Sequence, residues 1–158
     1  MRETTAYSGS VLPRTYESQN CSVARALEVV GDRWTLLILR SAFEGVRRFD
    51  DFQEALGIAR NVLTDRLTRL CDEGLFRRVR YQERPDRYEY RLTRKGVELW
   101  PAVMSLLLWG DRHYAPKGPP VVVAHRGCDG ALTDRFVCDS CGAPLGPNDV
   151  EARPGPGA

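Results

Sequence analysis

Four potential metal ligands lie near the C-terminus of this 158-residue chain. They form two pairs, each separated by two residues: His125 with Cys128, and Cys138 with Cys141. Gly142 follows the second pair, and a Cys-x-x-Cys-Gly sequence makes a tight turn that directs two thiolates toward one tetrahedral Zn²⁺. The surrounding segment is too short and too rich in glycine to fold on hydrophobic burial alone. We therefore expect a Cys₃His zinc site; the alternative is a flexible tail with free or redox-paired thiols.

Cys21 is a second candidate for chemistry, because it lies near the start of a predicted helix. Asn20 can cap a helix that runs from Cys21 to about Val30. The peptide N–H groups at a helix N-terminus favour a thiolate, and Arg25 lies one turn further along. We expect Cys21 to sense an oxidant or electrophile; the alternative is a small residue buried in an interface.

A third group of side chains has the chemistry needed to contact nucleic acid. Residues 60–95 contain eleven Lys and Arg against six Asp and Glu, whereas the rest of the chain is near neutral or slightly acidic. One basic segment in such surroundings is typical of a phosphate-binding surface, and a solvated charged face is the alternative. The candidates for contact with DNA are Arg60, Asn61, Thr64, Thr68, Arg69, Arg84 and Arg87.

A predicted helix over residues 59–73 must position most of these side chains. Leu63, Leu67 and Leu70 recur at helical spacing and form its inward face. Short polar residues occupy the opposite side, and Arg60 lies where the helix begins. Such side chains can reach base edges in the major groove, and we expect Asn61 to pair with adenine.

Two further helices are predicted between the helix that starts at Cys21 and this one. Residues 33–43 include four consecutive aliphatic residues with no polar face, so this helix is expected to be buried on nearly all sides. Asp32 is suited to cap it. A shorter helix over residues 49–56 is expected to end at Gly57.

The residues after the helix over 59–73 predict a basic hairpin. Segments 75–81 and 87–92 alternate apolar and charged residues, and the loop over 82–86 contains a Pro-Asp turn pair. Arg84 and Arg87 are then near the tip, where we expect them to hold phosphate or the minor groove. Three helices followed by a hairpin predict a mainly α fold with a small β wing, the winged helix-turn-helix.

The end of the chain predicts one more helix and an extension. Thr93 can cap a helix that continues to about Tyr114, with a kink at Pro101. This helix carries two apolar faces, which is more than one small domain can bury, so we expect a partner chain. The predicted division is a mobile arm over 1–19, a domain over 20–115 and a cysteine-containing extension over 116–158.

With these features, the chain resembles the HxlR-type winged-helix transcriptional regulators, relatives of the MarR group. One departure is Pro85-Asp86-Arg87-Tyr88, where the family more often has two prolines and a small apolar residue. The matching segments are Cys21, Gly31 to Arg40, Arg48-Phe49, Ile58 to Leu70, Tyr88 to Tyr90, Leu92-Thr93 and Lys95-Gly96.

The resemblance implies a homodimer built from the first and last helices that binds double-stranded DNA. Each recognition helix would enter one half-site of a near-palindromic operator, with the helices about 34 Å apart. Repression or activation of a neighbouring gene is implied, often in response to a small-molecule or oxidant effector, and we expect a repressor. The alternative is a winged-helix or zinc-knuckle adaptor that contacts proteins without binding specific DNA.

Other classes of protein fit the sequence poorly. No apolar run approaches the length of a membrane span, and the first ten residues have no apolar signal region, so we expect a cytoplasmic protein without a membrane partner. An odd count of five cysteines argues against a disulfide framework. An enzyme is not expected, because neither of the two histidines adjoins an obvious nucleophile and no phosphate-binding glycine loop is present.

Overall fold

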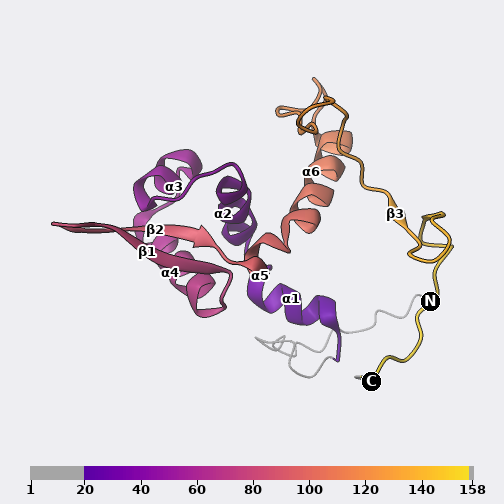
Figure 1. The fold of residues 1–158 in the computed structure, drawn as a ribbon, viewed down its shortest axis with the longest axis horizontal. Helices are drawn as coiled ribbons and strands as arrows, with labels where there is room; N and C mark the ends of the chain where they lie inside the picture. The colour runs from indigo at the N-terminus through magenta and orange to yellow at the C-terminus, as the bar shows by residue number, and fades with distance from the viewer. Residues whose placement is uncertain (1–19, 157–158) are drawn as a thin grey trace, which may run out of the picture.

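The computed structural model describes residues 20–156, so the predicted mobile arm over 1–19 lies outside the described residues. A helical body carries a long hairpin at one end, and an extended C-terminal segment leaves the body at the other (Figure 1). The elements in chain order are α1 (Ser22–Val30), α2 (Arg33–Phe43), α3 (Phe49–Leu56), α4 (Arg60–Asp72), β1 (Phe76–Glu83), β2 (Asp86–Leu92), α5 (Arg94–Val97), α6 (Trp100–Tyr114), β3 (Phe136–Val137) and β4 (Pro144–Leu145). This is the predicted mainly helical fold with a small antiparallel hairpin.

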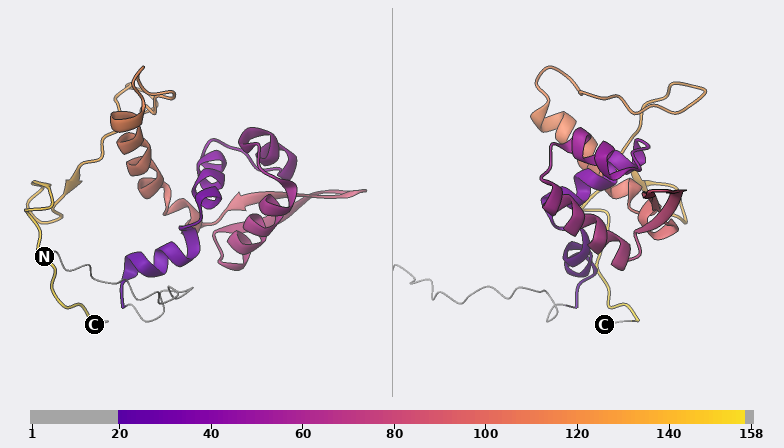
Figure 2. Two further views of the ribbon diagram at one scale, coloured as in Figure 1. Left: turned by 180° about the vertical axis from the view of Figure 1, so that it is seen from behind. Right: turned by 90° about the vertical axis from the view of Figure 1, so that its left-hand side faces the viewer.

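The core lies where α2, α3 and α4 pack together against the base of the hairpin, as the two views in Figure 2 show. The predicted inward face of α4 is confirmed, because Leu63, Leu67 and Leu70 are all buried. Phe52 of α3 meets Phe76 of β1 edge to face, with ring centroids 6.4 Å apart. This aromatic pair fixes the hairpin relative to the helices that precede it.

Helix α2 has the predicted bounds and the predicted cap, since the Asp32 carboxylate accepts a hydrogen bond of 3.0 Å from the Trp34 N–H. The expectation that it is buried on nearly all sides is wrong. Ile38 and Leu39 are fully buried, but Leu37 is 40% exposed. The helix packs against α3, α4 and α6 within the described chain, and these neighbours leave the side that carries Leu37 open.

The hairpin extends further toward its tip than predicted. Pairing runs from Phe76 with Leu92 to Glu83 with Asp86, so only two residues form the loop instead of five. The chain before α3 adds a short third stretch to this sheet, because the Tyr90 N–H donates to the Arg47 carbonyl at 2.7 Å. The base of the wing is thereby tied to the start of the helix-turn-helix.

The single kinked helix predicted at the end of the domain is instead two helices. Thr93 caps the first, α5, by accepting a hydrogen bond of 3.2 Å from the Gly96 N–H. Pro101 lies in the first turn of α6, where its missing N–H leaves no helical hydrogen bond unmade. Proline therefore starts a new helix here and does not bend a continuous one.

The apolar side chains of α6 have different surroundings. Val103 and Met104 are buried against the core. Leu106 and Trp109 of α6 are about half exposed, as is Leu27 of α1. No helix among residues 20–156 is long and apolar enough to cross a membrane.

The C-terminal extension contains two small hairpins. Ala124 bridges to Ala131 in the first, and β3 pairs with β4 in the second. Between them, the Asp134 carboxylate accepts a hydrogen bond of 2.7 Å from the Arg112 guanidinium of α6, which lowers the pKa of Asp134.

Candidate nucleic-acid interface

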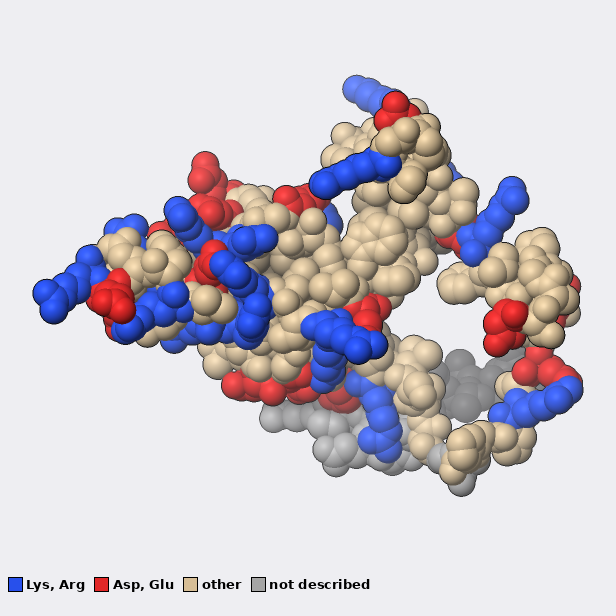
Figure 3. Space-filling view, viewed as in Figure 1, with Lys and Arg blue, Asp and Glu red and all other residues tan. Residues whose placement is uncertain are grey.

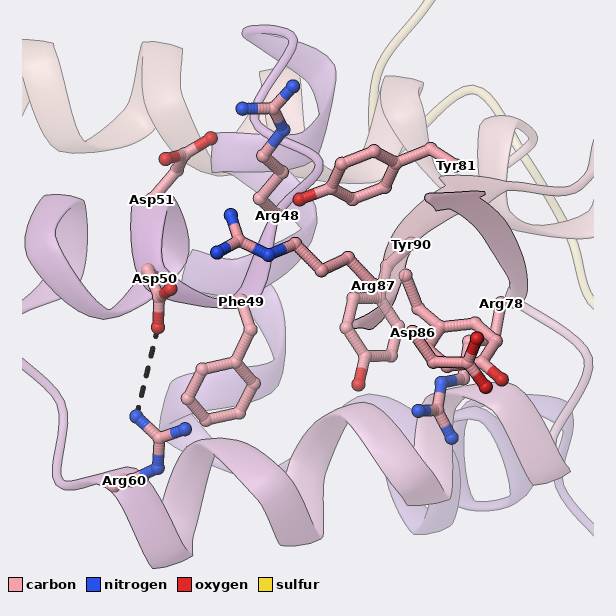
Figure 4. A pocket seen from close by; sticks show the side chains of 11 residues that line it. Arg48, Phe49, Asp50, Asp51, Arg60, Arg78, Tyr81, Asp86, Arg87 and Tyr90 are labelled. Carbon is pink, nitrogen blue, oxygen red and sulfur yellow. Dashed lines mark ion pairs between the residues drawn. The ribbon is translucent and has the colours of Figure 1, made fainter. Parts of the chain in front are cut away.

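A cavity of about 450 Å³ lies between α3, the start of α4 and the hairpin (Figure 4). Four arginines and three aspartates line it, so positive charge has a small excess. Tyrosine and phenylalanine rings form much of the remaining wall. The lining residues are Arg48, Phe49, Asp50, Asp51, Arg60, Arg78, Tyr81, Asp86, Arg87, Tyr88 and Tyr90.

Aromatic rings of the hairpin hold two of these arginines in place. The Arg48 guanidinium lies 4.7 Å from the ring centroid of Tyr81, and that of Arg78 lies 3.7 Å from the centroid of Tyr88. A cation over an aromatic face is stabilised while its N–H donors stay free to bind an anion. These two arginines are therefore oriented before any phosphate arrives.

Arg60, at the start of α4, is held more weakly. Its guanidinium lies 4.8 Å from the ring centroid of Phe49 and 3.7 Å from the Asp50 carboxylate. Both charged side chains are mostly exposed, and exposed ion pairs contribute little to stability. Arg60 can therefore exchange Asp50 for a phosphate at small cost.

The outward face of α4 presents the short polar residues that the sequence predicted. Asn61, Thr64 and Thr68 are all exposed. The Thr64 hydroxyl donates a hydrogen bond of 2.9 Å to the Arg60 carbonyl, so its hydrogen is used within the helix and its oxygen remains an acceptor. This face lies in the N-terminal two-thirds of α4, the part of a recognition helix that contacts bases.

Arg69 takes part in a contact that the sequence did not predict. Its guanidinium donates to the backbone carbonyl of Glu28, which links α4 to α1. The neighbouring Arg66 forms an ion pair of 3.1 Å with Asp32 and links α4 to the start of α2. The contact of Arg69 with DNA stays a prediction, and its position in the fold also gives it a structural role.

The wing arginines differ in their surroundings. Arg84 lies in the two-residue loop at the tip, whereas Arg87 points from β2 into the cavity beside Phe49 (Figure 4). Arg80 is held by Glu83 and Asp86 at 3.1 and 3.3 Å. Lys and Arg side chains gather over the hairpin and its tip in the space-filling view (Figure 3).

The candidates predicted from the sequence for contact with DNA did not include Arg78, Tyr81 or Tyr88, which line the cavity. The sequence did contain a sign of them, because Tyr81 and Tyr88 alternate with arginines along the hairpin. Which ring lies beside which arginine depends on the register of β1 against β2. That register shifts by one residue between Arg80 and Gln82. A sequence without a known register therefore could not identify which ring meets which guanidinium.

The thiol predicted to sense oxidants lies at the start of α1. Cys21 itself is the N-cap, because its extended backbone precedes α1 and its carbonyl accepts the Arg25 N–H at 3.0 Å. The prediction that Asn20 caps this helix is therefore wrong by one residue. Cys21 is exposed, whereas burial raises the pKa of the Cys71 thiol and makes it a poorer nucleophile.

The four predicted zinc ligands remain as two separate pairs. The Nδ1 atom of His125 lies 3.1 Å from the Sγ atom of Cys128. Backbone N–H groups of Cys141 and Ser140 donate to the Cys138 sulfur and lower the pKa of that thiol. Within residues 20–156, no three histidine, cysteine or acidic side chains form one group that could hold a metal ion.

Comparison with known proteins identifies similar chains and similar structures. Rv3095, an HTH-type transcriptional regulator of Mycobacterium tuberculosis, is 48% identical over 137 residues, which is 86% of this chain and 87% of the relative. The crystal structure of the candidate transcription factor PA1607 matches with a TM-score of 0.77 at 38% identity, over 85% of this chain and 94% of that one. The redox regulator HypR in its reduced form matches with a TM-score of 0.55 at 30% identity, over 60% of this chain and 97% of that one.

The family match covers the helices and the wing together. Residues 29–118, more than half of the chain, match the HxlR-like helix-turn-helix family. This range includes the helix-turn-helix, the hairpin and α6, but not the C-terminal hairpins. The chain therefore belongs to the HxlR-like helix-turn-helix family and is a transcriptional regulator with a helix-turn-helix domain.

Proposed function

We propose that this protein represses transcription by binding a near-palindromic operator as a homodimer, with α4 of each protomer in the major groove. The observation that carries the proposal is the exposed polar face of α4 beside an arginine-lined cavity under a basic wing. Asn61, Thr64 and Thr68 would read base edges. Arg60, Arg84 and Arg87 would bind the backbone or the minor groove, and steer the protein onto DNA.

The homodimer is supported by the apolar side chains that the single chain leaves exposed. Val23 and Leu27 of α1, and Leu106 and Trp109 of α6, lie on the two helices that extend from the body (Figure 1). Exposed apolar patches of this kind mark contact surfaces in proteins. A twofold dimer through these helices would place two copies of α4 for two half-sites about one DNA turn apart.

Fluorescence anisotropy against the protein's own upstream DNA and a scrambled duplex, at about 50 and 200 mM salt, tests the proposed function. We expect a preference of roughly 1,000-fold or more for the upstream DNA. Equal, steeply salt-dependent binding to both duplexes would contradict sequence specificity. Failure to bind either duplex would favour the protein-interaction adaptor.

We also propose that Cys21 couples DNA binding to oxidant. Its exposed thiol at the start of α1 lies in the helix proposed for dimer contact, so a modified sulfur there would alter the dimer. The thiolate would attack one oxygen of hydrogen peroxide and break the O–O bond, which gives sulfenic acid and releases hydroxide. The solved relative HypR is a redox regulator, which is consistent with this role.

Substitution of Cys21 with serine tests this coupling. We expect peroxide to weaken DNA binding by the wild-type protein at least about tenfold, with recovery after a thiol reductant, and to leave Cys21→Ser unchanged. Cys71→Ser is the matched control, because its half-buried thiol should not take part. An unaltered peroxide response in Cys21→Ser would assign the sensing to another residue.

A further inference from the structure

The two cysteine-containing turns of the C-terminal extension take no part in the DNA interface. In the first, the His125 N–H donates to the Gly130 carbonyl at 2.9 Å, and the Asp129 N–H donates to the His125 carbonyl at 3.1 Å. These bonds close a loop that holds the imidazole and the Cys128 thiol 3.1 Å apart. Two different donors for a soft metal ion are thus placed on one side of the turn.

The second turn brings two thiols together. The Gly142 N–H donates to the Cys138 carbonyl and the Cys138 N–H donates to the Ala143 carbonyl, both at 2.9 Å. Gly142 has a φ of 71°, a backbone conformation that favours glycine. The side chains of Cys138 and Cys141 also form a hydrogen bond with each other within this turn.

The hairpin that carries the second turn has almost no apolar core. Phe136 and Val137 of β3 are 68% and 59% exposed. Phe136 borders a small pocket against α6, and Figure 1 shows β3 at the end of an extended run. Segments of this size that cannot bury enough apolar surface need a covalent or metal cross-link to stay folded.

We propose that the two turns together bind one structural Zn²⁺ per chain through His125, Cys128, Cys138 and Cys141. Three thiolates and one imidazole in a tetrahedral arrangement match the preference of Zn²⁺ for sulfur and nitrogen ligands. Each turn alone supplies two ligands, and a structural zinc site needs four. The proposal therefore requires the turns to meet.

Movement of the second turn toward the first would have to occur within the link between them. Val123 and Leu132 pack against the core and fix the first turn to the body, whereas residues 133–135 belong to no helix or strand. The partly exposed ion pair of Asp134 with Arg112 ties this link to α6, so the movement would have to break it. Rotation of the β3–β4 hairpin about residues 133–135 would fold the second turn back onto the first within the same chain.

The test uses the full-length protein, purified under reducing conditions without a metal-affinity tag. Elemental analysis should find about one zinc per chain, and replacement by Co²⁺ should give the visible absorption of a tetrahedral thiolate site. The double variants Cys138→Ser/Cys141→Ser and His125→Ala/Cys128→Ser should each lose all of the metal, because each leaves only two ligands. Cys21→Ser/Cys71→Ser is the control and should keep it.

Three outcomes would overturn the proposal. One is a protein that binds no zinc at equimolar concentration in the presence of reductant. Another is full zinc retention in either double variant, which would place the site elsewhere. The third is a disulfide between Cys138 and Cys141 in the metal-free protein that survives mild reduction. The DNA-binding test above involves none of these ligands, so failure of the zinc site and failure of the proposed function are distinguishable.

Discussion

Asn61→Ala is expected to weaken binding to the operator by roughly 10- to 100-fold while leaving binding to unrelated DNA nearly unchanged. Asn61 is exposed in the first turn of α4, beside the cavity-lining Arg60. Its amide can donate one hydrogen bond to adenine and accept another, and alanine can make neither. Anisotropy titrations with the operator, and with duplexes that carry each base at the contacted position, measure the loss of discrimination.

Arg84→Ala is the matched control for this prediction. Arg84 lies at the tip of the wing, where it is proposed to contact phosphate or the minor groove. Its loss should weaken binding to all duplexes alike and reduce the slope of log affinity against log salt by about one. If Asn61→Ala instead weakened every duplex equally, Asn61 would be a backbone contact and base reading would pass to Thr64 or Thr68.

Gly96→Ala is expected to lower the free energy of unfolding by about 3 kcal/mol, and the melting temperature by roughly 10 °C. A Cβ at position 96 would lie 2.3 Å from the Leu75 carbonyl oxygen and 3.0 Å from a methyl group of Leu92. The carbonyl cannot move freely, because it accepts the Thr93 N–H at 2.9 Å. Chemical denaturation and calorimetry of the purified variant measure the change.

Gly110→Ala controls for the general effect of replacing glycine with alanine. Gly110 lies inside α6, and a Cβ there would meet no atom of the described residues within 4 Å. Alanine favours a helix interior over glycine by about 1 kcal/mol, so this variant should be as stable as the wild type or more so. Equal loss of stability in both variants would show that close packing at Gly96 is not the cause.

The bounds of α2 and α3 follow from residues next to each other in the chain. Asp32 caps α2 through its own side chain, and Gly57 ends α3 with a φ of 60° that glycine adopts easily. The inward face of α4 follows from leucine spacing alone. These features depend on local backbone preference and periodicity, which a sequence contains in full.

Contacts between distant residues could not be predicted in this way. The pairing of Arg48 with Tyr81 spans two elements, and the bond from Arg69 to Glu28 spans 41 positions. Both depend on how α1, the hairpin and α4 are placed in space. The sequence therefore did not identify the tyrosines that hold Arg48 and Arg78, although it did identify Arg84 at the tip of the wing.

The sequence by itself determined the helix-turn-helix, its basic wing and the polar face of α4, because each arises from periodicity, capping and charge within short segments. Only the tertiary structure decided that Pro101 begins a separate helix, that Leu37 remains exposed and that arginine-bearing elements enclose a cavity. These three features depend on which surfaces of the helices and the hairpin pack together. Packing between segments far apart in the chain decides this, and no local sequence pattern specifies it.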